Sequence, residues 1–236
     1  GLAQTGTGKT AAFTLPILQR LIKGPRRRVR ALIVVPTREL AEQIYQITVE
    51  LGKNTRLRSV AVYGGVSKKS QISRLRKGVE IVIACPGRLL DLVGDGVIDL
   101  RQTEILGLDE ADRMCDMGFM PDIRRIIKIL PAKRQTLCFA ATMPDDIRNL
   151  TDKILRNPVR VQIGRISPAK SVSHALYPVP DQLKKDLFFA VLEQTRTGRV
   201  LVFARTKYRA RNLARDLGKR GYRAAALQGN MSQNQR

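Results

Sequence analysis

The segment Glu104-Ile105-Leu106-Gly107-Leu108, followed by Asp109-Glu110-Ala111-Asp112, decides the fold class of this chain. A short apolar run that ends in acids is typical of a buried strand whose carboxyl end lies at the edge of a parallel sheet. In open α/β sheets, ligands bind outside this edge. The segment therefore predicts an α/β protein with a candidate site at Asp109.

A glycine-rich loop, Ala3-Gln4-Thr5-Gly6-Thr7-Gly8-Lys9-Thr10, lies near the start of the sequence and leads into an apolar run with helical spacing. Glycines let the backbone approach phosphate oxygens, and the free N–H groups of a helix N-terminus favour an anion. Lys9 is expected to reach the β- and γ-phosphates, and the Thr10 hydroxyl to join the shell of a Mg²⁺ ion. The nucleotide-binding residues predicted from this loop are Thr5, Gly6, Thr7, Gly8, Lys9 and Thr10.

The strict phosphate-loop pattern has a glycine where this chain has Ala3. The alternative interpretation is a glycine-rich turn before an ordinary helix. Gly8-Lys9-Thr10 at the start of a helix favours the phosphate loop over that alternative.

The acidic segment supplies what the loop lacks. Asp109 is expected to hold Mg²⁺ through water, and Glu110 to orient and deprotonate the attacking water, so Glu110 and Lys9 are the predicted catalytic residues. Asp112 is expected to pair with another segment. Loop and acids together predict an enzyme driven by a nucleoside triphosphate with Mg²⁺.

Charge indicates the partner. The 236 residues contain 43 Lys+Arg against 20 Asp+Glu, a net charge of +23, which favours a polyanion, with nucleic acid ahead of a membrane. There is no long apolar run or signal pattern, so no membrane association is expected.

The cysteines and the histidine limit the possible chemistry. Cys85, Cys115 and Cys138 are isolated and His174 is the single histidine, which excludes structural zinc and a histidine triad. A reduced, cytoplasmic compartment is expected.

Strands and helices are predicted to alternate along the chain, which gives a doubly wound parallel sheet. The predicted strands are Ala31–Val35, Val60–Tyr63, Ile81–Ala84, Ile105–Leu108, Thr136–Ala140 and Val159–Ile163. Most of the polar candidates follow directly after a strand.

A polar stretch with glycine, proline and serines predicts a domain boundary, with a first domain over 1–164, a linker over 165–173 and a second domain over 174–236. After it we predict strands at Ala175–Val179, Val200–Ala204 and Arg223–Leu227, with helices at Asp181–Glu193 and Lys207–Arg220. This second domain is too short to complete a doubly wound sheet. The chain is therefore expected to be a fragment of a longer protein.

In order and spacing, the motifs resemble those of DEAD-box RNA helicases over essentially the whole chain. The matching segments are Ala3–Thr10, Pro36–Leu40, Gly64-Gly65, Pro86-Gly87-Arg88, Asp109–Asp112, Ala141-Thr142, Val202–Lys207 and Gln233–Arg236. Phe203–Arg220 and Leu227–Arg236 are most similar to bacterial members of the RhlE-type branch.

The resemblance implies two RecA-like domains that close around ATP and single-stranded RNA and locally separate a short duplex. It implies RNA-backbone contacts at Pro36, Thr37, Arg38, Gly64, Gly65, Pro86, Gly87 and Arg88 in the first domain, and at Gly229, Gln233 and Arg236 in the second. It implies coupling between the domains through Asp112, Ala140 and Thr142. Glycine amides and arginines contact phosphates and sugars, and the chain has few aromatic residues, so binding is expected to be indifferent to sequence and dependent on salt.

The chain departs from the family pattern at two positions. Ala140 replaces a serine whose hydroxyl, in the family, helps couple hydrolysis to unwinding. Ala140→Ser is therefore expected to raise strand separation more than ATP turnover. The alternative is that Ala140 is only a small core residue and that a neighbouring group compensates for the missing hydroxyl. Cys85 replaces a threonine before Pro86. The family's adenine-binding motif and arginine fingers fall outside residues 1–236, so the chain by itself is expected to hydrolyse ATP poorly.

Two other functions remain open at this point. A DNA translocase would use the same phosphate chemistry, although Pro36–Leu40 and the Asp-Glu-Ala-Asp spelling favour RNA. A non-catalytic, ATP-gated RNA clamp is the second alternative, which Lys9 and Glu110 disfavour and Ala140 keeps open.

Overall fold

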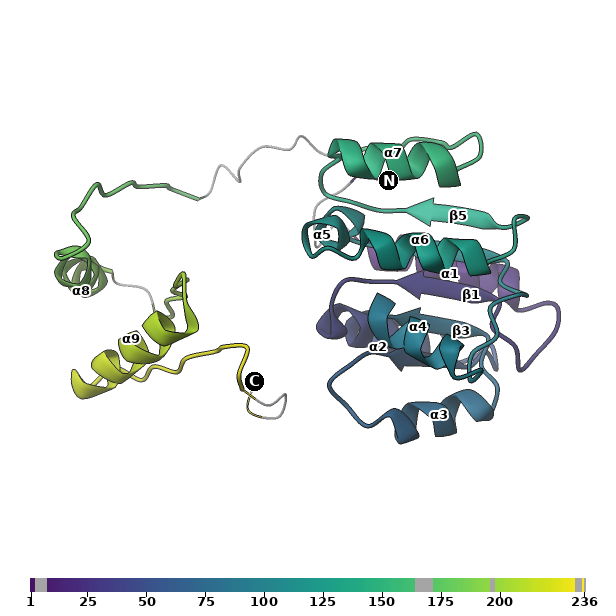
Figure 1. The fold of residues 1–236 in the computed structure, drawn as a ribbon, viewed down its shortest axis with the longest axis horizontal. Helices are drawn as coiled ribbons and strands as arrows, with labels where there is room; N and C mark the ends of the chain where they lie inside the picture. The colour runs from purple at the N-terminus through teal and green to yellow at the C-terminus, as the bar shows by residue number, and fades with distance from the viewer. Residues whose placement is uncertain (3–7, 164–171, 196–197, 232–234, 236) are drawn as a thin grey trace. The chain divides into compact units, whose positions relative to one another are not determined.

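The computed structural model describes residues 1–2, 8–163, 172–195, 198–231 and 235. The chain divides into two compact units, Gly1–Ser167 and Pro168–Arg236, and each is described by itself. Figure 1 shows the elements of both units. None of the helices in the described ranges is long and apolar enough to cross a membrane.

A five-stranded parallel sheet forms the centre of the first unit. Its strands are β1 (Ala31–Val34), β2 (Ser59–Val62), β3 (Ile81–Ala84), β4 (Ile105–Leu108) and β5 (Gln135–Cys138), in the spatial order β2-β3-β1-β4-β5. Neighbouring strands pair in step along their whole length, as Val34 does with Ala84 and Leu108. All five carboxyl ends therefore lie at one edge of the sheet, which we call the carboxyl edge.

Helices connect the strands. They are α1 (Lys9–Leu21), α2 (Arg38–Gly52), α3 (Lys68–Arg76), α4 (Pro86–Gly94), α5 (Ala111–Asp116), α6 (Met120–Ile129) and α7 (Asp145–Ile154). Several begin directly after a strand, which places their N-termini at the carboxyl edge.

The core has two layers because alternate side chains of a strand point to opposite faces of the sheet. Leu32 and Val34 of β1 belong to the buried cluster that includes residues of α4, α6 and α7. Ala31 and Ile33 belong to the cluster formed with α1 and α2. Helices thus cover both faces (Figure 1), which confirms the predicted doubly wound α/β class.

The first five predicted strands are confirmed, two of them with the predicted bounds and three with ends that differ by one or two residues. The predicted strand Val159–Ile163 is wrong: this segment forms only an isolated bridge between Gln162 and Leu2. Leu2 donates its N–H to Val161 and accepts from Ile163, and a second bridge joins it to Ala140. Leu2 therefore lies between the residues after β5 and the 161–163 segment.

The second unit contains α8 (Lys184–Gln194) and α9 (Lys207–Lys219), in agreement with the two predicted helices. The strands predicted at Ala175–Val179, Val200–Ala204 and Arg223–Leu227 are wrong, because none of these segments belongs to a ladder. Their apolar side chains are exposed, as at Leu176 (90%) and Phe203 (89%). An apolar pattern favours an extended chain, but a strand also needs a neighbour with which to exchange backbone hydrogen bonds.

Candidate functional site

The carboxyl edge of the sheet brings most of the predicted site residues of the first unit together. Thr37-Arg38, Gly64-Gly65, Pro86–Arg88 and Asp109-Glu110 follow β1, β2, β3 and β4. They are far apart in the sequence, and the parallel pairing of the strands gives them a common edge.

The N-terminus of α1 has the geometry of an anion site. Gly8, its N-cap, has φ of 83° and ψ of 10°, a left-handed conformation that favours glycine. No side chain caps the helix, so the N–H groups of its first turn have no partner within it. Lys9 and Thr10 occupy its first two positions, half-buried. The predicted residues Thr5, Gly6 and Thr7 lie outside the described residues.

Asp109 is the buried acid of this edge, with 4% of its surface exposed. Burial raises the pKa of its carboxyl above the ordinary value, while the nearby charge of Lys9 and a hydrogen bond from the Glu110 N–H (3.0 Å) act in the opposite direction. A cation close to Asp109 therefore stabilises its ionised form, which is the form that binds a metal.

Glu110 adopts a strained backbone conformation, with φ of 50° and ψ of 49°, as the N-cap of α5. Its carboxylate lies 3.2 Å from the Arg113 guanidinium, in a partly exposed ion pair. A non-glycine residue in this region costs about 1–3 kcal/mol and recurs at functional sites. The turn directs Glu110 out of the line of β4, while Asp109 remains at the end of the strand.

Asp112 connects α5 to the segment after β5. Its Oδ2 accepts hydrogen bonds from the N–H of Ala141 (3.2 Å), the N–H of Thr142 (2.8 Å) and the Thr142 hydroxyl (2.8 Å). Ala140 is buried beside this contact and donates its N–H to the Gly1 carbonyl. The three predicted coupling residues thus lie within one short stretch of structure, although their coupling role stays a prediction.

The residues present fit a nucleotide with Mg²⁺. Among the described residues, no group of three or more His, Cys, Asp or Glu side chains could hold a metal ion by itself. Mg²⁺ usually binds through one or two protein oxygens together with substrate phosphates. The Asp109 carboxylate and the Thr10 hydroxyl provide oxygen ligands of this kind, beside a helix N-terminus suited to the phosphates.

The start of α2 presents a guanidinium without a full set of partners. The Thr37 hydroxyl caps the helix by accepting from the Leu40 N–H at 3.3 Å. Arg38 stacks on the Tyr63 ring, with its Cζ 4.8 Å from the centroid, and its buried Nη1 has no hydrogen-bond partner in the described part of the chain. Gly65 (φ 77°) lies alongside, where an added Cβ would be 3.7 Å from that Nη1. A phosphate oxygen at this exposed turn would satisfy the buried donor.

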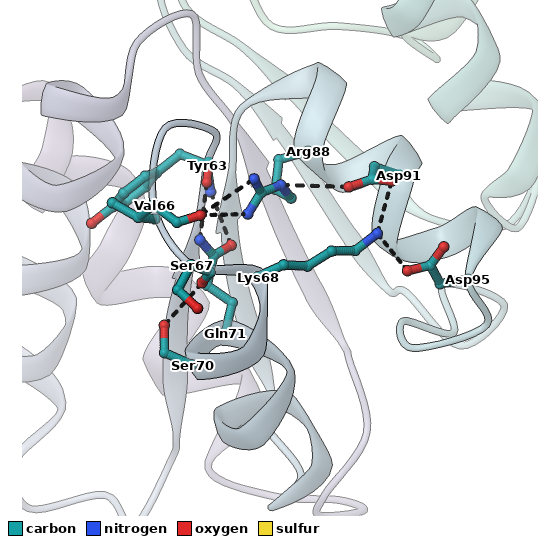
Figure 2. A network of polar contacts seen from close by, with 9 residues as sticks. All are labelled: Tyr63, Val66, Ser67, Lys68, Ser70, Gln71, Arg88, Asp91 and Asp95. Carbon is teal, nitrogen blue, oxygen red and sulfur yellow. Dashed lines mark hydrogen bonds and ion pairs between the residues drawn. The ribbon is translucent and has the colours of Figure 1, made fainter. Parts of the chain in front are cut away.

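A second guanidinium lies close to the same turn. Both terminal nitrogens of Arg88 donate to the Val66 carbonyl, at 3.3 and 3.4 Å, and its Nε lies 3.5 Å from Asp91 (Figure 2). Lys68 spans from the turn to α4, with its Nζ 2.8 Å from Asp91 and 2.5 Å from Asp95. These contacts attach the glycine turn to α4.

Sequence reasoning missed the residues that support this turn. Gln71, 5% exposed, donates to the Tyr63 carbonyl at 2.9 Å and accepts from its N–H at 3.3 Å. Nothing local marks a glutamine for such a role. Asp91 and Asp95, by contrast, are four residues apart on a helix, a spacing that puts two carboxylates on one face and could have indicated a shared cation.

The start of α4 combines an open backbone with an inert thiol. Pro86 occupies the first helical position, and the space in front of Gly87 is open. Burial raises the pKa of the Cys85 thiol to about 12, so this cysteine behaves as a small apolar residue. In the second unit, Gly229 lies in an exposed turn; Gln233 and Arg236 lie outside the described residues.

Comparison with known proteins gives a consistent result. Residues 1–150 match the family model described as DEAD/DEAH box helicase. The chain is 40% identical over 235 residues to the DEAD-box ATP-dependent RNA helicase RhpA of Helicobacter pylori, with 99% of the chain and 47% of RhpA covered. It is 40% identical over 246 residues to the ATP-dependent RNA helicase DBP3 of Saccharomyces cerevisiae, with 100% of the chain and 47% of DBP3 covered. It is 41% identical over 237 residues to the DEAD-box ATP-dependent RNA helicase CshA of Streptococcus pneumoniae, with 100% of the chain and 45% of CshA covered. The chain thus spans a little under half the length of these curated relatives.

Proposed function

The chain belongs to the DEAD/DEAH box helicase family, and we propose that it is part of an ATP-dependent RNA helicase that hydrolyses ATP under stimulation by RNA and locally unwinds RNA duplexes. The observation that supports this most is the meeting of Lys9, Asp109 and the Asp112–Thr142 contact around one edge of the sheet. A phosphate-binding helix, a metal-binding acid and a connection to the last strand are the parts that a phosphoryl-transfer engine requires.

In this proposal the chain's own groups divide the reaction between them. The N-terminus of α1 and Lys9 hold and orient the phosphates, with Thr5, Gly6, Thr7 and Gly8 in the preceding loop. Thr10 and Asp109 would hold Mg²⁺, which when bound supplies positive charge to the β- and γ-phosphate oxygens. Glu110 orients the attacking water and accepts its proton.

The RNA path in the first unit follows the carboxyl edge. Arg38, with its buried donor, and the N–H groups at the start of α4 contact phosphates, and the glycine turn at Gly64-Gly65 leaves room for the strand. Contacts of this kind are made to the backbone and bring no base specificity. Pro36, Thr37, Pro86, Gly87 and Arg88 complete the path, and Gly229, Gln233 and Arg236 belong to it in the second unit.

The remaining assignments are also proposals. Residues 1–164 form the first RecA-like domain, 165–173 the linker and 174–236 part of the second RecA-like domain, a division supported by the change of compact unit between Ser167 and Pro168. We assign the chain to the RhlE-type branch because of the sequences of 203–220 and 227–236. We assign a cytoplasmic location because the cysteines are isolated. Asp112, Ala140 and Thr142 couple the nucleotide site to movement of the two domains.

The test is steady-state ATP turnover of the full-length protein with RNA, with DNA and with neither, beside the Glu110→Gln variant. We expect stimulation by RNA alone, loss of turnover in Glu110→Gln, and retained binding of nucleotide in that variant. Equal stimulation by DNA would replace the proposal with a DNA translocase.

An ATP-gated RNA clamp is the other outcome to separate. RNA retention is measured in ATP and in ADP together with turnover. RNA held in ATP and released in ADP without repeated turnover would establish the clamp and overturn the helicase.

A further inference from the structure

A dense group of cations lies at the opposite edge of the sheet, where the strands begin. Four described segments meet there: 22–28 before β1, 53–58 before β2, 74–78 before β3 and 99–102 before β4. We call this surface the basic edge. Its exposed cations are Lys23, Arg26, Arg27, Arg28, Lys53, Arg56, Arg58, Arg74, Arg76, Lys77 and Arg101.

The four segments contact one another directly. The Arg58 guanidinium donates to the Lys77 carbonyl at 2.9 Å, and Arg26 donates to the Thr55 carbonyl at 3.4 Å. The Arg28 guanidinium is hydrogen-bonded to Gln102. These bonds join all four segments into one continuous surface.

A buried acid fixes the backbone of the basic edge. Glu80, 1% exposed, accepts the N–H of Arg27 through Oε1 and the N–H of Arg58 through Oε2, both at 2.7 Å. Arg27 and Arg56 hold left-handed conformations, with φ of 60° and 59°. Such conformations persist only where the surrounding structure imposes them, and they cluster at binding sites. Glu80 thus presents the arginines on a rigid frame, which lowers the entropy lost when a ligand binds.

Apart from the buried Glu80, little negative charge balances this surface. Asp99 is the single acid within the four segments, and it pairs with Arg101 at 2.9 Å. The side chains of Arg56, Arg74, Arg76 and Lys77 make no hydrogen bond or ion pair with another described residue. Uncompensated cations held close together repel one another and destabilise the fold unless a polyanion neutralises them.

The composition of the basic edge favours a nucleic-acid backbone over a membrane surface, and the proposed function identifies that nucleic acid as RNA. Arginines predominate, and their planar forks suit phosphate oxygens. The four segments contain no aromatic residue, so they offer neither a platform for stacking bases nor the aromatic anchors of a membrane-surface segment. Backbone contacts to a duplex require neither of these.

We propose that the basic edge is a second RNA-binding surface, which holds the backbone of a duplex flanking the strand bound at the carboxyl edge. This inference rests on the proposed RNA binding at the carboxyl edge. A four-residue strand is about 13 Å long, so at least this distance separates the two edges. Only an RNA that extends beyond the carboxyl edge reaches the second surface, which predicts a dependence on RNA length.

The experiment compares two RNAs and two variants of the full-length protein. One RNA is a single strand of about 10 nucleotides, within the site size of a single-strand groove. The other joins that strand to a duplex of about 20 base pairs, longer than the span of a double-stranded RNA-binding module. The basic-edge variant is Arg56→Asn, Arg74→Gln, Arg76→Gln and Lys77→Gln, with asparagine at 56 because it tolerates positive φ.

The control variant is Arg124→Gln, Lys128→Gln, Arg148→Gln and Lys153→Gln. These four cations of α6 and α7 are also exposed, without a partner among the described side chains, and they belong to none of the four segments of the basic edge. The control therefore removes the same charge from a surface where Asp122, Asp145, Asp146 and Asp152 are interspersed. Thermal unfolding of both variants checks that they remain folded.

For the extended RNA we expect the basic-edge variant to lose about tenfold or more in affinity, and the slope of log K against log salt to become shallower by about 2–4 units. The control variant loses less, and the short strand binds all three proteins alike. Equal losses in the two variants, or an unchanged slope, would overturn the proposal.

Two further outcomes are distinguished. If the unmodified protein fails to bind the short strand, RNA binding at the carboxyl edge is refuted instead. If the basic-edge variant binds both RNAs normally but loses binding to vesicles of phosphatidylserine and phosphatidylcholine, the surface serves a membrane and the proposal is wrong.

Discussion

The contact between Asp112 and Thr142 is the clearest place to test how the site is held together. The variants are Thr142→Val and Asp112→Ala, made singly and combined. Valine keeps the shape of threonine but removes the hydroxyl that donates to the Asp112 carboxylate at 2.8 Å. Alanine removes the acceptor of all three hydrogen bonds at this position.

The expected magnitudes follow from the number of bonds lost. A hydrogen bond to a charged group contributes about 1.5–3 kcal/mol to stability, and Thr142 is exposed, so Thr142→Val should cost about 1.5 kcal/mol. Asp112→Ala should cost about 3 kcal/mol, because two backbone donors also lose their partner. In the double variant the hydroxyl has no acceptor left to lose, so the total should remain about 3 kcal/mol, which gives a coupling energy of about 1.5 kcal/mol.

Urea unfolding followed by far-ultraviolet circular dichroism measures all four proteins. Thr48→Val is the matched control, because its hydroxyl donates to the Ile44 carbonyl at 2.7 Å within α2 and has no contact with Asp112. Thr48→Val and Asp112→Ala should add within about 0.5 kcal/mol. The same additivity for Thr142→Val would refute the reasoning, because it would show that the Thr142 hydroxyl is not coupled to the Asp112 carboxylate.

Three more predictions concern buried groups of the site. Burial raises the folded-state pKa of Asp109, so protonation stabilises the fold at low pH and this contribution is lost as pH rises through that pKa. Asp109→Asn should therefore raise the melting temperature at pH 7 by about 2–4 °C, raise it less at pH 4, and weaken the binding of Mg²⁺-nucleotide. An unchanged or lower melting temperature at pH 7 would contradict this. With its pKa near 12, Cys85 should be about 0.01% thiolate at pH 8, so maleimide labelling measured by mass spectrometry should be very slow and rise about tenfold per pH unit; a plateau near pH 9 would show the pKa to be wrong. Ala140→Ser in the full-length protein should raise strand separation more than ATP turnover, and equal changes in the two rates would favour the view that Ala140 is only a small core residue.

Much of the first unit was predictable because its signals are local. Apolar runs such as Ile81–Ala84 are buried throughout in the sheet, and the polar residues that follow them lie at the carboxyl edge as expected. The second unit was predictable only in its helices, since a helix forms its hydrogen bonds within one segment and a strand does not. Val200–Ala204 has the composition of a buried strand and yet makes no ladder.

The sequence by itself determined the parallel α/β class, the helix beginning at Lys9, the acids after β4 and the family, because each of these depends on residue types at short, fixed spacing. Tertiary structure decided which distant groups meet: the Asp112 carboxylate with Thr142, Arg88 with the Val66 carbonyl, and Glu80 with the backbone of Arg27. It also shifts the pKa of Asp109 upward, because burial at the end of β4 raises this pKa more than the charge of Lys9 lowers it. Contacts and burial of this kind arise from strand order and packing, which connect residues that no local pattern links.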